Sequence, residues 1–158
     1  MKLIVFSMFL LASASLHASG EDSLLALSDH IMGPVVRVNT LSVSKSGVVT
    51  DVHYDISAES NEHWPSNGTR RLGTLSASQL QTIKAYIGSE FGRLPRVIDS
   101  GAPIPLDGPD KSICVEIHSN RVCSVMYENQ APDQGSSAAQ SFRSDWQRLT
   151  ELLQSAGG

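Results

Sequence analysis

The chain has 158 residues and a formal net charge of -4 at pH 7, with 12 Lys and Arg against 16 Asp and Glu. The charges are scattered, with no basic cluster beyond Arg70-Arg71, so we expect neither nucleic acid nor an anionic membrane surface as a partner. Residues 19–158 are enough for one domain with its own core and too few for two ordinary domains.

The first 18 residues are typical of a secretory signal peptide. Lys2 precedes an apolar run, and small residues suited to cleavage follow it. Cleavage after Ala14 and cleavage after Ala18 both fit, and the second is favoured because it leaves a polar start. The apolar run is about half of the roughly 20 residues that a membrane span requires, so no span is expected. The leader predicts an exported protein that is periplasmic or secreted.

The first predicted elements after the leader belong to an N-terminal arm and a hairpin. In the arm, residues 19–34, several leucines indicate a short helix or a segment that packs on one side. Two predicted strands follow at 35–43 and 48–57, joined by a turn through Gly47. The second strand alternates in polarity. The alternation predicts a core face of Val48, Thr50, Val52, Tyr54 and Ile56 and a solvent face of Asp51, His53 and Asp55.

A helix is predicted most clearly between Gly73 and Pro95, after a possible short strand at 70–72. Ser76 and Gln79 have the spacing of a capping box, in which each side chain bonds the other residue's backbone N–H. The apolar positions that continue the pattern lie on one helical stripe. They are Leu80, Ile83 and Ile87, followed by Phe91 and Leu94.

The two cysteines, Cys114 and Cys123, predict a disulfide, because an exported chain meets an oxidising compartment and their number is even. They lie on two short predicted strands around an expected turn at Ser119-Asn120. A two-residue loop there would place the cysteines diagonally on one face, and a shift of one residue would place them directly opposite. No CxxC spacing is present to indicate a redox role.

A second helix is predicted at the end of the chain, with Ser137 as its cap and Gln140 at capping-box spacing. Its apolar stripe consists of Phe142, Trp146, Leu149 and Leu153. Residues 155–158 are expected to form a disordered tail. The order hairpin, helix, hairpin, helix predicts one α+β domain over residues 35–154, with an antiparallel sheet from two hairpins and two amphipathic helices on one face.

This layout resembles a group of small exported bacterial domains of mostly unknown role. The resemblance rests on GTLS before the first helix, on Phe91-Gly92-Arg93-Leu94-Pro95 at its close, and on the Pro-rich loop, hairpin and helix that follow. The layout is also similar to that of the emfourin-type inhibitors of thermolysin-like metalloproteases. The resemblance covers roughly residues 35–153 and implies a binding domain. It identifies no inhibitory residue, and the disulfide hairpin and the long loop at 96–111 depart from it.

Two polar loops, 58–69 and 96–111, carry apolar residues suited to contact with a partner. Proline-stiffened loops lose little conformational entropy on binding. The alternative for the second loop is a connection that only spans the sheet. The predicted partner-binding residues are Trp64, Pro65, Val97, Ile98, Ile104, Pro105 and Leu106.

No catalytic residue, cofactor or metal is predicted. Asp51, His53 and Asp55 have a spacing that aligns metal ligands along a strand, but a solvated face explains them better. Neither G-x-S-x-G nor H-E-x-x-H occurs. The sequence therefore predicts an exported, non-enzymatic binding protein whose partner is another protein, with protease inhibition as the sharpest form. An envelope-associated structural or small-ligand-binding protein is the first alternative, and a hydrolase with a site assembled from loops is the second.

Overall fold

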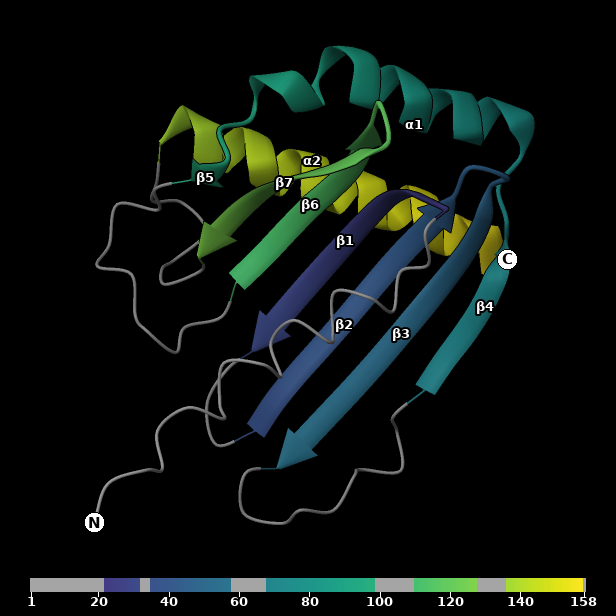
Figure 1. Cartoon of the computed structure of the whole chain (residues 1–158), viewed down its shortest axis with the longest axis horizontal. Coiled ribbons are helices and arrows are strands. Elements are labelled where there is room, and N and C mark those ends of the chain that lie inside the picture. Colours follow the sequence, from purple (N-terminus) through teal and green to yellow (C-terminus); the bar gives the residue numbers. More distant parts are fainter. Residues whose placement is uncertain (1–21, 32–34, 58–67, 99–109, 128–135, 158) are drawn as a thin grey trace.

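The computed structural model describes residues 22–31, 35–57, 68–98, 110–127 and 136–157 (Figure 1). The strands are β1 (Ser23–Ile31), β2 (Val35–Ser44), β3 (Val48–Ser57), β4 (Gly68–Thr74), β5 (Val97–Ile98), β6 (Asp110–Ile117) and β7 (Asn120–Tyr127). The helices are α1 (Ala77–Ser89) and α2 (Ser137–Gln154), with short 3-10 turns η2 (Phe91–Arg93) and η3 (Ser155–Gly157).

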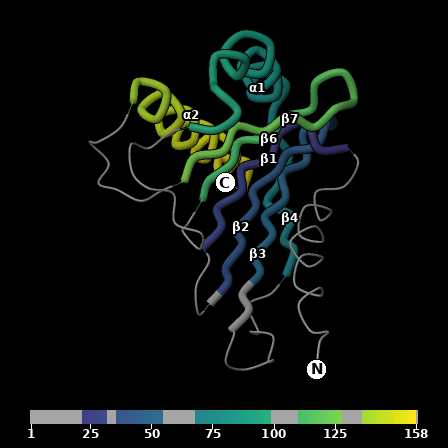
Figure 2. Tube along the Cα trace, turned by 60° about the vertical axis from the view of Figure 1, so that its left-hand side comes forward, coloured from purple at the N-terminus to yellow at the C-terminus, as the bar shows by residue number. Residues whose placement is uncertain are grey.

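The seven strands form one sheet in the order β4-β3-β2-β1-β6-β7-β5. Neighbouring strands are antiparallel, except that β5 runs parallel to β7. Both helices pack near one end of the sheet, and β2, β3 and β4 project beyond them (Figures 1 and 2). The predicted α+β class is confirmed.

The position of β1 corrects the expectation of a helix or a side-packed arm before residue 35. β1 lies in the middle of the sheet, paired with β2 on one side and β6 on the other. Leu25 and Leu27 belong to the core, and Ala26 and Ser28, which point to the opposite face, are also buried. A strand buried on both faces loses the period-two pattern that distinguishes strands in a sequence.

The faces of β3 are the reverse of the predicted ones. Val49 is fully buried in the core. Because side chains alternate along a strand, Asp51 and His53 lie on the same face as Val49. The core covers only the first part of β3, so this face is apolar at Val49 and polar further along. The prediction assumed even burial along the whole strand.

The hairpin of β6 and β7 confirms the disulfide and corrects its turn. His118 and Ser119 have φ of 49° and 63°, the left-handed conformation that a two-residue type I′ turn requires. The turn thus lies one residue earlier than expected. This shift places Cys114 directly opposite Cys123, and the two are joined by a disulfide.

The caps of both helices are set by serines. Ser76 Oγ accepts a hydrogen bond from Gln79 N–H at 3.3 Å, and Gln79 Oε1 accepts one from Ser76 N–H at 2.9 Å, so the predicted capping box is confirmed. α2 begins one residue before expectation, because Ser136 and not Ser137 accepts from Ala139 N–H. The helices bury a stripe against the sheet. The stripe residues buried in the core are Ile83, Tyr86, Ala139, Phe142, Leu149 and Leu153.

The end of the chain is ordered as far as Gly157, where a disordered tail was expected. η3 packs on the edge of the sheet at β4, and Ala156 contacts the core. Gln79 Nε2 donates a hydrogen bond to Ser155 Oγ at 2.9 Å, which ties η3 to the start of α1. Gly158 lies outside the described residues.

Candidate functional site

A groove of about 630 Å³ lies where α2 meets the projecting part of the sheet. Strands β1 to β4 form its floor, α2 forms one wall, and η3 contributes Gly157. The groove is neither a closed cavity nor a flat surface.

The floor of the groove changes from apolar to charged across a single row of the sheet. Leu27 on β1 lies opposite Leu41 on β2, which lies opposite Asp51 on β3, which lies opposite Arg70 on β4. The two leucines border the core, and the two charged residues lie toward the edge strand. A ligand lying across this row would therefore meet apolar surface at one end and charge at the other.

The charged end of the floor is held by a loose ion pair. Arg70 Nη2 lies 3.3 Å from Asp51 Oδ2, and the Arg70 side chain is 75% exposed. Exposed pairs of this kind contribute only about 0 to 1 kcal/mol. Arg71 donates a hydrogen bond to Thr74 Oγ1 at 3.1 Å and has no carboxylate partner in the described part of the chain. These two arginines can therefore take up other partners easily.

The α2 wall presents Trp146, Thr150 and Gln154, which follow one another at helical spacing. Trp146 stacks on Phe142 with ring centroids 6.1 Å apart, and Lys111 Nζ lies 5.9 Å from the Trp146 ring. The Thr150 hydroxyl is buried, and no residue in the described part of the chain forms a hydrogen bond with it. The wall thus combines a packed aromatic ring with polar atoms at its margin.

Most of the predicted partner-binding residues lie outside the described residues, namely Trp64, Pro65, Ile104, Pro105 and Leu106. The other two, Val97 and Ile98, differ in their exposure to solvent. Val97 is 57% exposed and remains available to a partner. Ile98 is only 1% exposed, because it pairs with Met126 and packs in the core. It cannot contact a partner unless the core opens.

Of the three residues considered as metal ligands, the structure describes the side chains of Asp51 and His53. Asp51 is paired with Arg70, and His53 Nδ1 shares a hydrogen bond with Asn39 Oδ1. The side chain of Asp55 lies outside the described residues. Within the part of the chain that the structure describes, no three His, Cys, Asp or Glu side chains gather closely enough to hold a metal ion.

A second charged cluster joins the two helices. Arg148 on α2 lies 2.8 Å from Glu90 and 3.4 Å from Asp145, and its guanidinium lies 5.5 Å from the centre of the Tyr86 ring. Burial raises the pKa of Asp145 and raises that of Tyr86, the latter with help from the Asp145 carboxylate. Among the described residues, the Tyr86 hydroxyl nevertheless has no hydrogen-bond partner in proper geometry. These contacts hold α2 against the end of α1.

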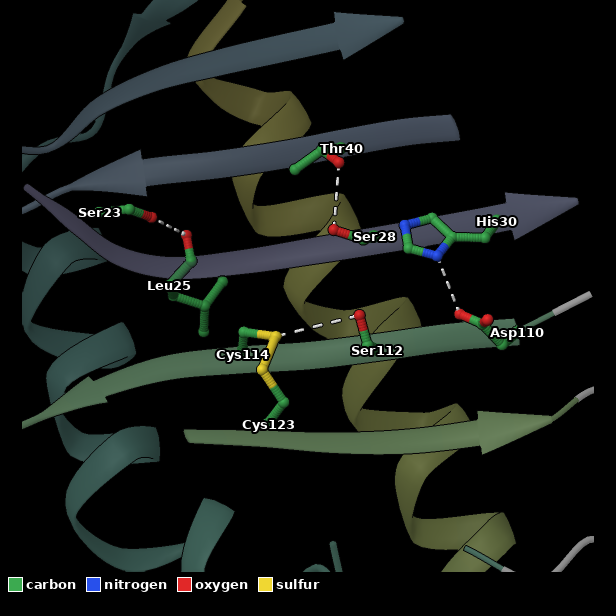
Figure 3. Close-up of a disulfide and its surroundings, with 9 residues drawn as sticks. All are labelled: Ser23, Leu25, Ser28, His30, Thr40, Asp110, Ser112, Cys114 and Cys123. Atoms are coloured by element: carbon green, nitrogen blue, oxygen red, sulfur yellow. Dashed lines mark hydrogen bonds and ion pairs between the residues drawn. A yellow bond between two sulfur atoms is a disulfide. The ribbon is translucent and has the colours of Figure 1, made fainter. Parts of the chain in front are cut away.

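The face opposite the helices carries a histidine, an aspartate and serines (Figure 3). His30 Nδ1 lies 3.2 Å from Asp110 Oδ1. The Ser28 hydroxyl shares a hydrogen bond with Thr40 at 3.1 Å and makes none with His30. The backbone N–H groups of these strands serve the sheet ladders, so no pair of them is free to stabilise an oxyanion. This constellation therefore lacks two parts of a serine hydrolase site.

Comparison with known proteins gives no indication of function, so the proposal below depends mainly on the groove. The chain matches no protein-family model, and no curated protein is significantly similar to it in sequence. Among the described residues, none of the helices combines the length and the apolar character needed to cross a membrane. Sequence reasoning missed the groove, although Arg70-Arg71 and the polar residues of β3 were visible as separate features.

Proposed function

We propose that this chain is an exported, non-enzymatic binding protein that holds a segment of another protein in the groove between α2 and strands β1 to β4. The observation that carries the proposal is the chemistry of the groove floor. The partly buried Leu41 offers apolar contact beside the core residue Leu27, and Asp51 and Arg70 offer charges held only by a weak, exposed pair. A central apolar area with a polar margin is the usual anatomy of a protein interface.

The open form of the groove favours a protein segment over a small molecule. Sites for small ligands bury most of the ligand surface, whereas this groove is only partly enclosed. An extended segment can lie in such a groove and continue beyond both ends. The leader and the disulfide between Cys114 and Cys123 support a place outside the cytoplasm.

Protease inhibition is the sharpest form of this proposal. It is supported by the similarity in layout to emfourin-type inhibitors, and by the exposed Val97 at the start of the long loop. In this form the bound segment belongs to a protease, and the complex reduces that protease's activity.

The test blocks the groove without disturbing the core. Gln154 is an exposed residue of α2 that lines the groove, so Gln154→Trp fills the groove. Gln140 is exposed in the first turn of the same helix and does not line the groove, so Gln140→Trp is the matched control. Each variant and the native chain are used to capture proteins from the envelope and culture fluid of the host.

We expect the native chain and Gln140→Trp to retain the same protein in a stoichiometric amount, and Gln154→Trp to lose it. A retained protease whose activity falls when the chain is added would establish the inhibitor form. If the native chain retains no protein, or if Gln154→Trp retains as much as the control, the proposal is wrong. Retention of a small molecule instead would favour the small-ligand alternative.

A further inference from the structure

β4 is the edge strand at one end of the described sheet. It hydrogen-bonds to β3 only, and it ends the strand order of the sheet. Along this outer side, no other described strand pairs with β4. An uncovered edge presents a row of backbone N–H and C=O groups to which another chain can pair.

The opposite edge of the sheet is built differently. There β5 has only two residues, Val97 and Ile98, and so offers almost no ladder. Very short edge strands are one way in which proteins prevent unwanted pairing. β4 has seven residues and therefore offers a longer ladder than β5. β7 has eight residues, of which only Val125 and Met126 pair with β5, so the rest of β7 also lacks a described strand on its outer side.

The fold closes one end of β4 and leaves the other end open. η3 lies against Leu72 and Gly73, where its backbone approaches that of the strand. Residues 68–71 are all exposed. Four extended residues span about 13 Å, which is long enough for several ladder hydrogen bonds. The open part of the edge is therefore a defined segment next to the groove.

An irregularity in β4 separates its apolar and charged side chains. The register shifts between the pairs Val49 with Gly73 and Thr50 with Arg71, which leaves Leu72 as an extra residue. Leu72 packs partly against the core, while Arg70 and Arg71 stay exposed at the mouth of the groove. Bulges of this kind re-aim side chains at sheet edges.

The charge on β4 indicates which kind of polypeptide segment would pair with its edge. Two adjacent exposed arginines favour an acidic segment. They disfavour a second copy of this chain, because two β4 strands paired about a two-fold axis would bring the four arginines together. We propose that β4 accepts an extended, acidic segment of the partner protein as an additional strand. This inference rests on the proposed function and specifies how the partner enters the groove.

The probes are three short peptides and the native chain. The first peptide alternates glutamate with valine and threonine, the second has lysine in place of glutamate, and the third is the acidic peptide with a central proline. We expect only the first to bind well, with an affinity that falls as salt is added. Hydrogen exchange should show new protection of amides at residues 68–71, because strand addition uses the outer N–H groups of β4.

Two charge variants test the arginines. Arg70→Glu with Arg71→Glu should lower affinity for the acidic peptide about tenfold and favour the lysine peptide. Arg93→Glu with Arg96→Glu removes two other exposed arginines away from β4 and should leave the preference unchanged. Unfolding curves of both variants confirm that they are folded. The exchange experiment on the native chain needs no variant.

Some outcomes overturn this inference alone. They are equal binding of the acidic and lysine peptides, protection that omits residues 68–71, or equal effects of the two charge variants. If the captured protein is retained by Arg70→Glu with Arg71→Glu but lost from Gln154→Trp, the groove proposal stands and strand addition fails. If the native chain captures no protein, the proposed function fails, and the peptide panel still decides whether β4 accepts an acidic strand.

Discussion

Gly73 lies so close to Ala156 that a Cβ atom at position 73 would overlap the Ala156 carbonyl oxygen. This contact seats η3 on the edge of β4. The hydrogen bond from Gln79 to Ser155 holds η3 from the other side, at the cap of α1. The end of the chain thus joins the edge strand to the first helix and forms part of the groove.

The contact predicts that Gly73→Ala destabilises the fold. The added methyl group must displace backbone, which we expect to lower the free energy of unfolding by about 1 to 3 kcal/mol. Gly88→Ala is the control, because Gly88 lies in α1 with nothing within 4 Å of an added Cβ. The control should be stabilising by about 0.4 to 1 kcal/mol. Urea unfolding measures both, and equal effects would contradict the packing of η3 on β4.

The disulfide predicts a loss of stability when it is removed. Cys114 and Cys123 are nine positions apart, and closing so short a loop stabilises by about 2 to 3 kcal/mol in the chain-entropy model. Cys114→Ala with Cys123→Ala should lose about this amount in urea unfolding. Adding a thiol reductant should shift the native midpoint toward that of the variant and leave the variant unchanged. An unmoved native midpoint under complete reduction would contradict the prediction.

The buried hydroxyl of Thr150 predicts a stabilising substitution. Thr150 Oγ1 has no hydrogen-bond partner among the residues that the structure describes, and a buried polar group without one costs about 1 to 3 kcal/mol. Thr150→Val replaces the hydroxyl by a methyl group of similar shape and should raise the free energy of unfolding. Thr82→Val is the same change at an exposed position of α1, where Oγ1 donates to the Ser78 carbonyl at 3.0 Å. Thermal unfolding should show a gain for the first variant alone.

The pKa of Asp145 predicts a pH dependence of stability. Burial is the main cause that raises this pKa above 3.8, the ordinary value for an aspartate, so folding favours the protonated carboxyl. Protonation of Asp145 stabilises the folded state. This stabilisation is fully present below pH 3.8 and is lost as pH rises through the raised pKa of the folded state. The stability of the native chain relative to Asp145→Asn should therefore decrease as pH rises over this range. Subtracting the free energy of unfolding of Asp145→Asn from that of the native chain removes the contribution of the carboxylates that both proteins share. A difference that stays constant or increases with pH would contradict the prediction.

Features set by neighbouring residues were predictable from the sequence. The capping box needs only Ser76 and Gln79 three positions apart, since one helical turn brings them together. The helical period predicted most of the two buried stripes, although it included Leu80 and missed Tyr86, which is buried in the core. The disulfide was predicted from two cysteines in a chain with an expected signal peptide. The turn was misplaced by one residue, because positive φ at His118 and Ser119 is uncommon for these residue types and carries little sequence pattern.

The tertiary structure alone decided the centre of the sheet and the groove. The sequence predicted an arm in place of β1, because a strand buried on both faces does not alternate in polarity. Val49 rather than Val48 faces the core, and this depends on how β3 packs in the folded chain. Asp51, Arg70 and Gln154 become neighbours around one groove only through the pairing of β3 with β4 and the path of α2. The sequence by itself determined the local elements, their caps and the disulfide, since these depend on residues close together along the chain. The pairing of strands and the packing of helices across the sheet depend on contacts between segments that are far apart in the sequence. The local periodicity of the sequence carries no information on these contacts.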